Sequence, residues 1–144
     1  MEINQETLMK ASYLEREANE LGERLEMIEK QISEMEDFMI SLNEFSKNPS
    51  KEIFSAIGKG VHVKSTLESK ELLVEVGKGY LVKKKPEEVV KIIEEQLKSL
   101  KGARIQIKSR LDIYSAALRE LVRQIEHTQR ENHKHKHDEN CKHD

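Results

Sequence analysis

Two short stretches near the middle of the chain decide its fold. Residues 57–64 read Ile-Gly-Lys-Gly-Val-His-Val-Lys, and residues 76–83 read Val-Gly-Lys-Gly-Tyr-Leu-Val-Lys. Each Gly-Lys-Gly triplet lies between runs rich in β-branched and aromatic residues, which favour strands. Hairpin turns require positive φ, which glycine adopts without steric cost. The repeat therefore predicts two successive β-hairpins within residues 52–85, linked by Glu68-Ser69-Lys70-Glu71.

These predicted strands are too short to form an independent domain. Isolated two-stranded hairpins are marginally stable in water, and their unpaired edges favour pairing with other chains. We therefore expect the hairpins to assemble with hairpins of partner subunits. The residues expected to mediate this oligomerisation are Ile57, Val61, Val63, Val74, Val76, Tyr80 and Val82, next to the turn glycines Gly58, Gly60, Gly77 and Gly79.

The segment before the hairpins has the periodicity of a coiled coil. Its apolar residues are separated alternately by three and four positions, the a/d pattern of a narrow seam. This pattern predicts a helix over residues 5–46, which Asn48-Pro49 ends because a residue before proline avoids helical geometry. The seam consists of Ala11, Leu14, Ala18, Leu21, Leu25, Ile28, Ile32, Met35, Met39 and Leu42.

The segment after the hairpins repeats this pattern and predicts a second helix over residues 86–130. Pro86 suits its first turn. Arg104 interrupts the seam, where it either fixes register, pairs across the helices or marks a local opening, and Gly102 marks a weak point or a close approach. Two matched seams predict an antiparallel helical hairpin. The second seam consists of Val90, Ile93, Leu97, Leu100, Arg104, Ile107, Leu111, Tyr114, Leu118, Leu121, Ile125 and Thr128.

Composition excludes several classes of protein. The 144 residues include 25 basic and 27 acidic ones, a balance that argues against a general nucleic-acid binder. No apolar run approaches the roughly 18 residues of a membrane span, and no signal peptide opens the chain. We therefore expect a cytoplasmic protein, and the single cysteine, Cys141, which cannot form an internal disulfide, fits a reducing compartment. So thin a chain offers no buried pocket for catalysis, and we expect neither enzymatic activity nor a cofactor.

Three other motifs have simpler explanations. The Gly-Lys-Gly triplets lack the Walker spacing and precede strands, so they are turns and not phosphate loops. His62 has no nucleophile or acid nearby in sequence and is expected on a hairpin surface. Residues 131–144 are expected to be a disordered, His-rich tail. Loose binding of a transition metal there is the alternative, with the possible ligands His133, His135, His137, Cys141 and His143.

The order of these segments resembles a known family. A coil is followed by Ile-Gly-Lys-Gly-Val-His-Val-Lys, by Leu-Leu-Val-Glu-Val-Gly-Lys-Gly-Tyr-Leu-Val-Lys-Lys, by Pro-Glu-Glu-Val-Val and by a second coil. This order is similar to that of the α-type subunit of archaeal prefoldin, and two hairpins instead of one favour the α class. The resemblance predicts an α+β fold with one prefoldin-like domain over residues 1–130, in which the hairpins join an intersubunit β-barrel.

The resemblance also implies a function. Prefoldin is a hetero-oligomer of two α-type and four β-type subunits, in which coiled coils project from a barrel platform. The coil tips hold unfolded proteins without ATP and transfer them to a group II chaperonin. Helix ends fray, which exposes apolar side chains there. The expected client-binding residues are Ile3, Leu8, Met9, Leu121, Val122 and Ile125. The alternative is a scaffold in which the same hairpins build a homo-oligomer or filament.

Overall fold

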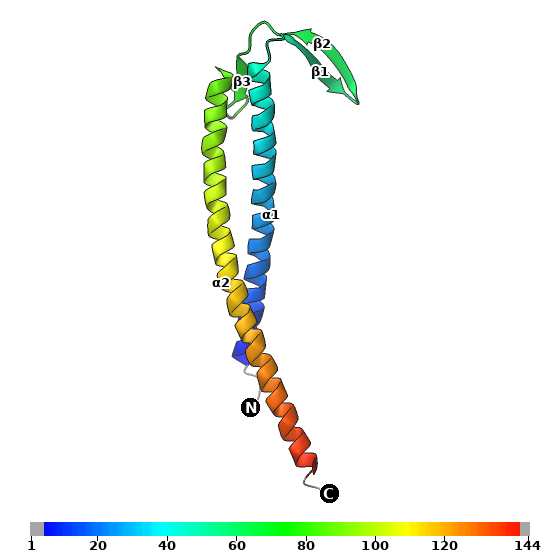
Figure 1. Ribbon diagram of the computed structural model, residues 1–144, viewed down its shortest axis with the longest axis vertical. Helices are drawn as coiled ribbons and strands as arrows, with labels where there is room; N and C mark the ends of the chain where they lie inside the picture. Colours follow the sequence, from blue (N-terminus) through cyan, green and yellow to red (C-terminus); the bar gives the residue numbers. More distant parts are fainter. Residues whose placement is uncertain (1–4, 142–144) are drawn as a thin grey trace. The chain divides into compact units, whose positions relative to one another are not determined.

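The computed structural model describes residues 5–141, with side chains described for residues 5–134. In the order of the sequence, one long helix precedes four short strands and a second long helix follows them (Figure 1). The elements are α1 (Gln5–Lys47), β1 (Glu52–Gly58), β2 (Val61–Thr66), β3 (Leu72–Glu75), β4 (Leu81–Lys84) and α2 (Pro86–Cys141). The predicted arrangement of two helices around two antiparallel hairpins is confirmed.

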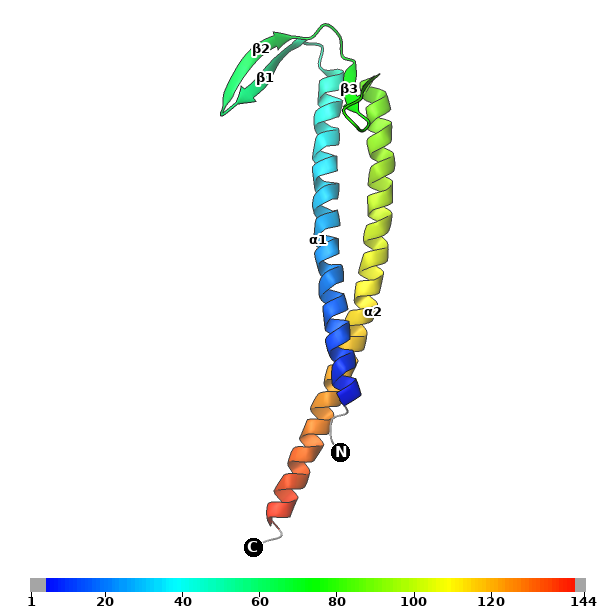
Figure 2. The same ribbon diagram turned by 180° about the vertical axis from the view of Figure 1, so that it is seen from behind.

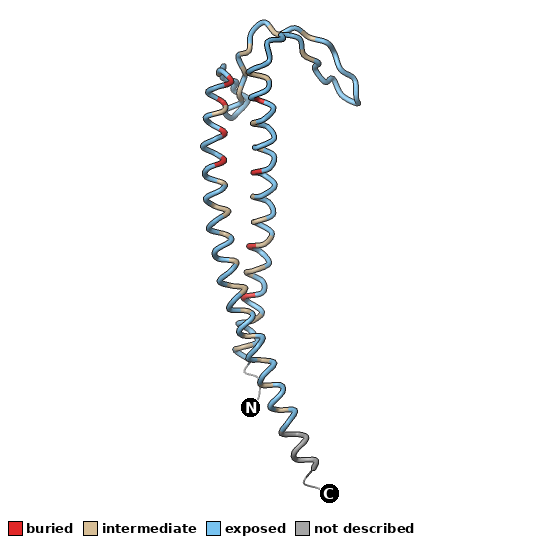
Figure 3. Tube along the Cα trace, in the orientation of Figure 1, coloured by how far each residue is buried: buried red, intermediate tan, exposed pale blue. Residues whose placement is uncertain are grey.

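The least exposed positions of both helices follow the predicted seams, except that Pro86 and Val89, which lie outside them, are also buried. Every seam residue from Ala11 to Leu42 and from Val90 to Thr128 is buried or half-buried, and the residues between them are mostly exposed. Figure 3 shows the buried positions spaced along the helices. The apolar side chains that are buried outright are Leu14, Leu21, Ile32, Leu42, Val89, Ile93 and Leu97. The core is therefore a narrow stripe, as an a/d pattern requires.

The chain divides into two compact units, each of which contains part of both helices. One unit comprises residues Lys30–Lys101 and includes the hairpins, and the other comprises Met1–Glu29 with Gly102–Asp144. In the first unit Ser46 Oγ lies 3.3 Å from Glu87 Oε1, and Lys101 Nζ lies 3.2 Å from Glu36 Oε1. As the residue number falls along α1 from Ser46 to Glu36, the number of its partner on α2 rises from Glu87 to Lys101. These helix segments are therefore antiparallel.

The second unit is held together in the same way. Lys108 Nζ lies 3.7 Å from Glu29 Oε1, and the same unit contains the buried Leu14 and Leu21 of α1 and half-buried seam residues of α2. Both interhelical ion pairs are about half exposed, and such pairs contribute at most about 1 kcal/mol each. Apolar burial along the seam is therefore the main stabilising contribution in both units.

Gly102 lies at the boundary between the two units, within α2. A methyl group built there would meet nothing within 4 Å, so this glycine does not serve a close approach of the helices. The other prediction, a weak point in the helix, agrees with this observation.

Because helical glycine is less favourable than alanine by about 0.8–1.0 kcal/mol, we expect Gly102→Ala to raise the free energy of unfolding by roughly that amount. Thermal unfolding followed by circular dichroism would measure it, with Gly22→Ala as a second helical glycine that has open space around it. A lower melting temperature for Gly102→Ala would show that the position needs its glycine.

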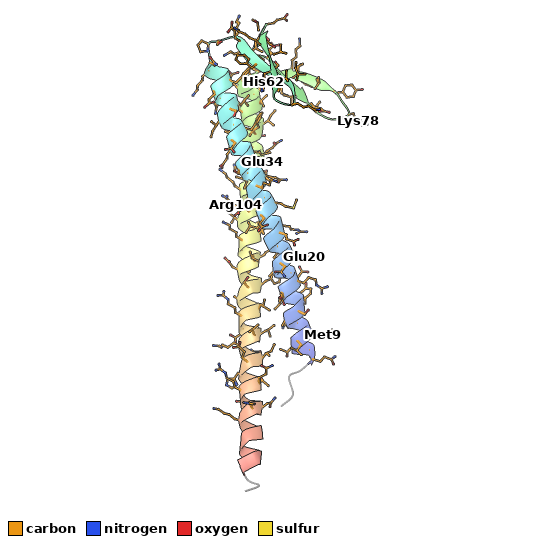
Figure 4. All side chains as sticks on the ribbon, turned by 90° about the vertical axis from the view of Figure 1, so that its right-hand side faces the viewer. Met9, Glu20, Glu34, His62, Lys78 and Arg104 are labelled. Atoms are coloured by element: carbon orange, nitrogen blue, oxygen red, sulfur yellow. The ribbon has the colours of Figure 1, made fainter. Side chains whose placement is uncertain are left out.

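Arg104 lies half-buried in the seam, as predicted. None of the ion pairs found among residues 5–134 involves it. Its sequence neighbours Lys101 and Lys108 make the interhelical ion pairs instead. The predicted pairing of Arg104 across the helices is therefore not seen within one chain. Figure 4 shows its position on α2.

The strands form two separate two-stranded antiparallel sheets, β1 with β2 and β3 with β4. In the first sheet Ser55 is opposite Val63, and the register shifts by one residue between Ala56 and Gly58. In the second sheet Val74 is opposite Val82 without a shift. Both hairpins can be followed from front and back in Figures 1 and 2.

Both Gly-Lys-Gly triplets adopt positive φ at all three residues. Lys59 and Gly60 have φ of 49° and 79°, and Lys78 and Gly79 have φ of 51° and 78°. These values are typical of type I′ turns, whose twist matches that of hairpin strands. In the second turn the amide of Tyr80 donates to the carbonyl of Gly77 at 3.0 Å. The prediction that each hairpin turns at its triplet is confirmed.

The C-terminal boundary of α2 differs from the prediction. The helix continues to Cys141 and not to residue 130, so residues 131–141 are helical where a disordered tail was predicted. The segment contains no glycine or proline, and lysine and glutamate favour helices. His127 Nδ1 also lies 3.5 Å from Glu131 Oε1, one turn apart on the helix. The prediction of disorder from the alternation of charge and histidine is therefore wrong for residues 131–141.

Candidate functional site

The first candidate site is the pair of hairpins. Six of the seven residues expected to mediate oligomerisation are exposed, and Val74 is half-buried. Tyr80 is 71% exposed and Ile57 is 70% exposed, which is unusual for apolar side chains of this size. The other exposed members are Val61, Val63, Val76 and Val82. An apolar surface of this kind marks a protein interaction site.

Three further apolar side chains of the hairpins are exposed but lie outside the predicted set. Phe54 is 74% exposed, Leu73 is 61% exposed and Leu81 is 57% exposed. In the second sheet the register puts Val74 and Val82 on one face and Leu73 and Leu81 on the other. Both faces of this sheet therefore carry apolar side chains, although Glu75 and Lys83 share the face of Leu73 and Leu81. The uninterrupted run Leu72-Leu73-Val74 is the sequence signal for this, since a strand covered on both faces lacks alternation.

The strand edges point to the same use. Because each sheet has two strands, every strand has one edge without a hydrogen-bonded neighbour among residues 5–141. Such an edge offers a row of backbone donors and acceptors to another strand. The hairpins thus combine open edges with exposed apolar faces, the two features that a partner hairpin would cover.

Lys70 connects the linker between the hairpins to the end of α1, a role that its sequence does not reveal. Its Nζ donates to the carbonyl oxygens of Phe45, at 3.1 Å, and of Asn48, and lies 5.8 Å from the centre of the Phe45 ring. The last carbonyls of a helix lack partners and carry partial negative charge, which a lysine satisfies. Leu67 additionally donates its amide to the carbonyl of Lys51 at 2.7 Å, which closes the base of the first hairpin.

The second candidate site lies on the second unit, at the start of α1 and around residues 121–125 of α2. Leu8, Met9 and Val122 are exposed by 48%, 68% and 43%, whereas Leu121 and Ile125 are half-buried in the seam. Figure 4 shows Met9 near the start of α1. Ile3, also expected there, lies outside the described residues. Exposed apolar side chains between charged ones suit weak binding of an unfolded chain, and methionine adapts to varied partners.

The remaining candidate residues are His62, the Gly-Lys-Gly triplets and the histidines and cysteine of the tail. His62 is exposed on β2 (Figure 4), and each Gly-Lys-Gly triplet leads into a strand and not into a helix. Among the tail residues His133 is exposed, the side chains of His135, His137 and Cys141 are not described, and His143 lies outside the described residues. No group of three potential metal ligands occurs where side chains are described.

Neither helix, over residues 5–141, contains a stretch long and apolar enough to span a membrane.

Comparisons with known proteins agree with the fold. The family model described as prefoldin subunit matches residues 14–131. Among solved structures, the chain is similar to the filamentous PFD of Methanocaldococcus jannaschii, determined by cryo-electron microscopy. The two share 16% sequence identity and a TM-score of 0.64, over 84% of this chain and 99% of the other. No curated protein matches the chain. The match of the family model covers most of both helices and both hairpins.

Proposed function

Since this chain belongs to the prefoldin family, we propose that it is an α-type subunit of an ATP-independent chaperone, which holds unfolded proteins at the tips of its coiled coil and transfers them to a group II chaperonin. The observation that carries this proposal is the exposed apolar surface on both hairpins, together with the exposed apolar residues near the start of α1 and around residue 122 of α2. The proposed location is the cytoplasm.

The hairpins support the assembly part of this function. Their exposed residues and free strand edges would be covered in a β-barrel shared by several subunits. Two hairpins in one chain present two such surfaces, so each subunit can join two neighbouring barrels. We propose β-type prefoldin subunits as the partners, in an α2β4 hexamer.

The coil supports the binding part. Leu8 and Met9 on α1 and Val122 on α2 are exposed, and charged residues surround them in the sequence. Contacts of this kind are weak and unspecific, which suits clients that share only exposed apolar groups. Nothing in this mechanism consumes a nucleotide, and the energy for release would come from competition by the chaperonin.

We expect the triple variant Leu8→Ser, Met9→Ser, Val122→Ser to lose most of its ability to prevent aggregation. The parent assembly should suppress light scattering by a chemically denatured client in the absence of ATP. The matched control is Met27→Ser, Ile113→Ser, whose two side chains are each 64% exposed on the same unit. Equal protection by the triple variant and the parent would refute the tip model. Equal losses in the variant and the control would show that clients bind exposed apolar residues anywhere on the unit and not the tips in particular.

Native mass spectrometry distinguishes the proposed assembly from a scaffold built of this chain alone. A mass of two copies of this chain with four copies of a β-type subunit is expected after mixing. A homo-oligomer or a filament that ignores the added subunit would favour the scaffold. The structurally similar protein from Methanocaldococcus jannaschii is filamentous by its description, so the measurement includes the chain without a partner.

A further inference from the structure

The two flanks of the helix pair differ in the unit Lys30–Lys101. In the heptad notation, with Met35 at a d position and Met39 at an a position, e positions follow d and g positions precede a. The e flank carries the ion pair between Glu36 and Lys101, whose atoms lie 3.2 Å apart. The g positions themselves carry no charged residue in this unit. Their residues are Gln31, Phe38, Phe45, Val89 and Gln96.

This run of uncharged g positions is specific to one unit. In the other unit the g positions of α1 are Lys10, Glu17 and Arg24, all charged. Charges at e and g positions normally limit a coil to two strands and select its partner. A helix with apolar residues at a, d and g has instead the wider stripe of a helix that packs against two neighbours in a bundle. Within this chain, α2 supplies one neighbour.

The g flank is also hollowed into a groove of about 800 Å³. Seam residues Met35 and Leu100 form part of its lining, together with Phe38 and Ile92, which are 52% and 36% exposed. All lining residues belong to the unit Lys30–Lys101. The groove lies between two helices, and its apolar residues recur along their axes, so a third helix fits it better than a compact ligand.

The charge of the lining indicates which helix would bind. Glu34, labelled in Figure 4, and Glu95 line the groove, and no lysine or arginine does. We propose that this groove is a docking site for an amphipathic helix of a partner protein, whose apolar stripe packs on Phe38 and Ile92 and whose flanking lysines or arginines face Glu34 and Glu95. This site is separate from the proposed client-binding tips, and it recognises an ordered helix and not an unfolded chain.

The test uses the full chain in its assembled form and a fluorescein-labelled peptide of about 18 residues, long enough for helix formation. The peptide has leucine at positions i, i+3, i+4 and i+7 and lysine beside this stripe. Fluorescence anisotropy should show saturable binding. Phe38→Gln with Ile92→Gln should weaken it at least about tenfold, since buried anchors dominate helix-in-groove binding.

The matched control is Ile40→Gln with Ile105→Gln. These side chains are 59% and 67% exposed, one on each helix, and neither lines the groove. The control should bind the peptide as the parent does. If it loses as much affinity as the groove variant, general surface hydrophobicity explains binding and the proposal fails. Circular dichroism of all variants should remain that of the parent, which separates lost docking from lost folding.

Charge provides an independent arm. A peptide with glutamate in place of lysine should bind at least about tenfold more weakly at low salt, and Glu34→Gln with Glu95→Gln should remove most of that preference. Equal binding of both peptides to the parent would overturn the assignment of a basic partner. So would self-association of this chain that Phe38→Gln with Ile92→Gln abolishes, because a second copy would then occupy the groove.

Discussion

Replacing Val63 and Val82 by lysine should convert the assembled protein into single chains. Val63 lies on β2 and Val82 on β4, so each hairpin receives one charge. Both side chains are exposed in the single chain, by 45% and 40%, and a lysine there keeps its charged group in water. In an assembled barrel the same ammonium group would lose its water without a partner, which costs several kcal/mol per ion.

Native mass spectrometry, or light scattering coupled to size exclusion, measures this effect directly. The control variant is Met27→Lys with Ile113→Lys, whose side chains are at least as exposed and lie on the helices. We expect the control to keep the mass of the parent and both variants to keep their helical signal. A double hairpin variant that retains the parent mass would show that assembly does not use these faces.

Replacing Leu97 by alanine should produce a large loss of stability for a single substitution in the helices. Leu97 is 6% exposed and is one of only seven apolar side chains that the described residues bury outright. Leucine-to-alanine changes at buried sites cost about 2–5 kcal/mol, and the narrow seam has few other contacts that could compensate. We expect a loss of stability near the lower end of this range, because none of the side chains described in residues 5–134 is fully buried.

The change would be measured as a shift in the midpoint of urea or thermal unfolding, at one fixed protein concentration because assembly contributes to stability. Ile92→Ala on the same helix is the matched control, since Ile92 is 36% exposed. The control should cost less than about 1 kcal/mol. A similar shift for both variants would mean that the seam is not the main source of stability in this unit.

The helices and hairpins were predictable because each depends on local sequence. Steps of three and four residues placed the predicted seam at buried or half-buried positions but missed the buried Val89, and the Gly-Lys-Gly triplets placed both turns. The end of α2 was not predictable from composition, since alternating lysine and histidine in residues 131–141 is compatible with either a helix or disorder. Helix continuation depends there on the absence of a stop signal, which is weaker evidence than a positive pattern.

The candidate sites were only partly predictable. Exposure of Tyr80 and Val61 follows from the thinness of the hairpins, and open edges follow from two-stranded sheets. The role of Lys70 depends on how the linker folds back onto the last turn of α1, a tertiary contact with no local sequence pattern. The groove beside Phe38 was not predictable, because a heptad assignment alone does not show on which flank of the helix pair a groove opens.

The spacing of the interhelical ion pairs has a consequence for the evolution of this protein. Going from Glu36 with Lys101 to Glu29 with Lys108 means seven residues back along α1 and seven forward along α2. Removing facing heptads from both helices would thus leave the remaining partners matched, whereas removing one from a single helix would mismatch every pair beyond the deletion. The two helices can therefore lengthen or shorten together by about 10 Å at a time, provided that each insertion or deletion in one helix is matched in the other.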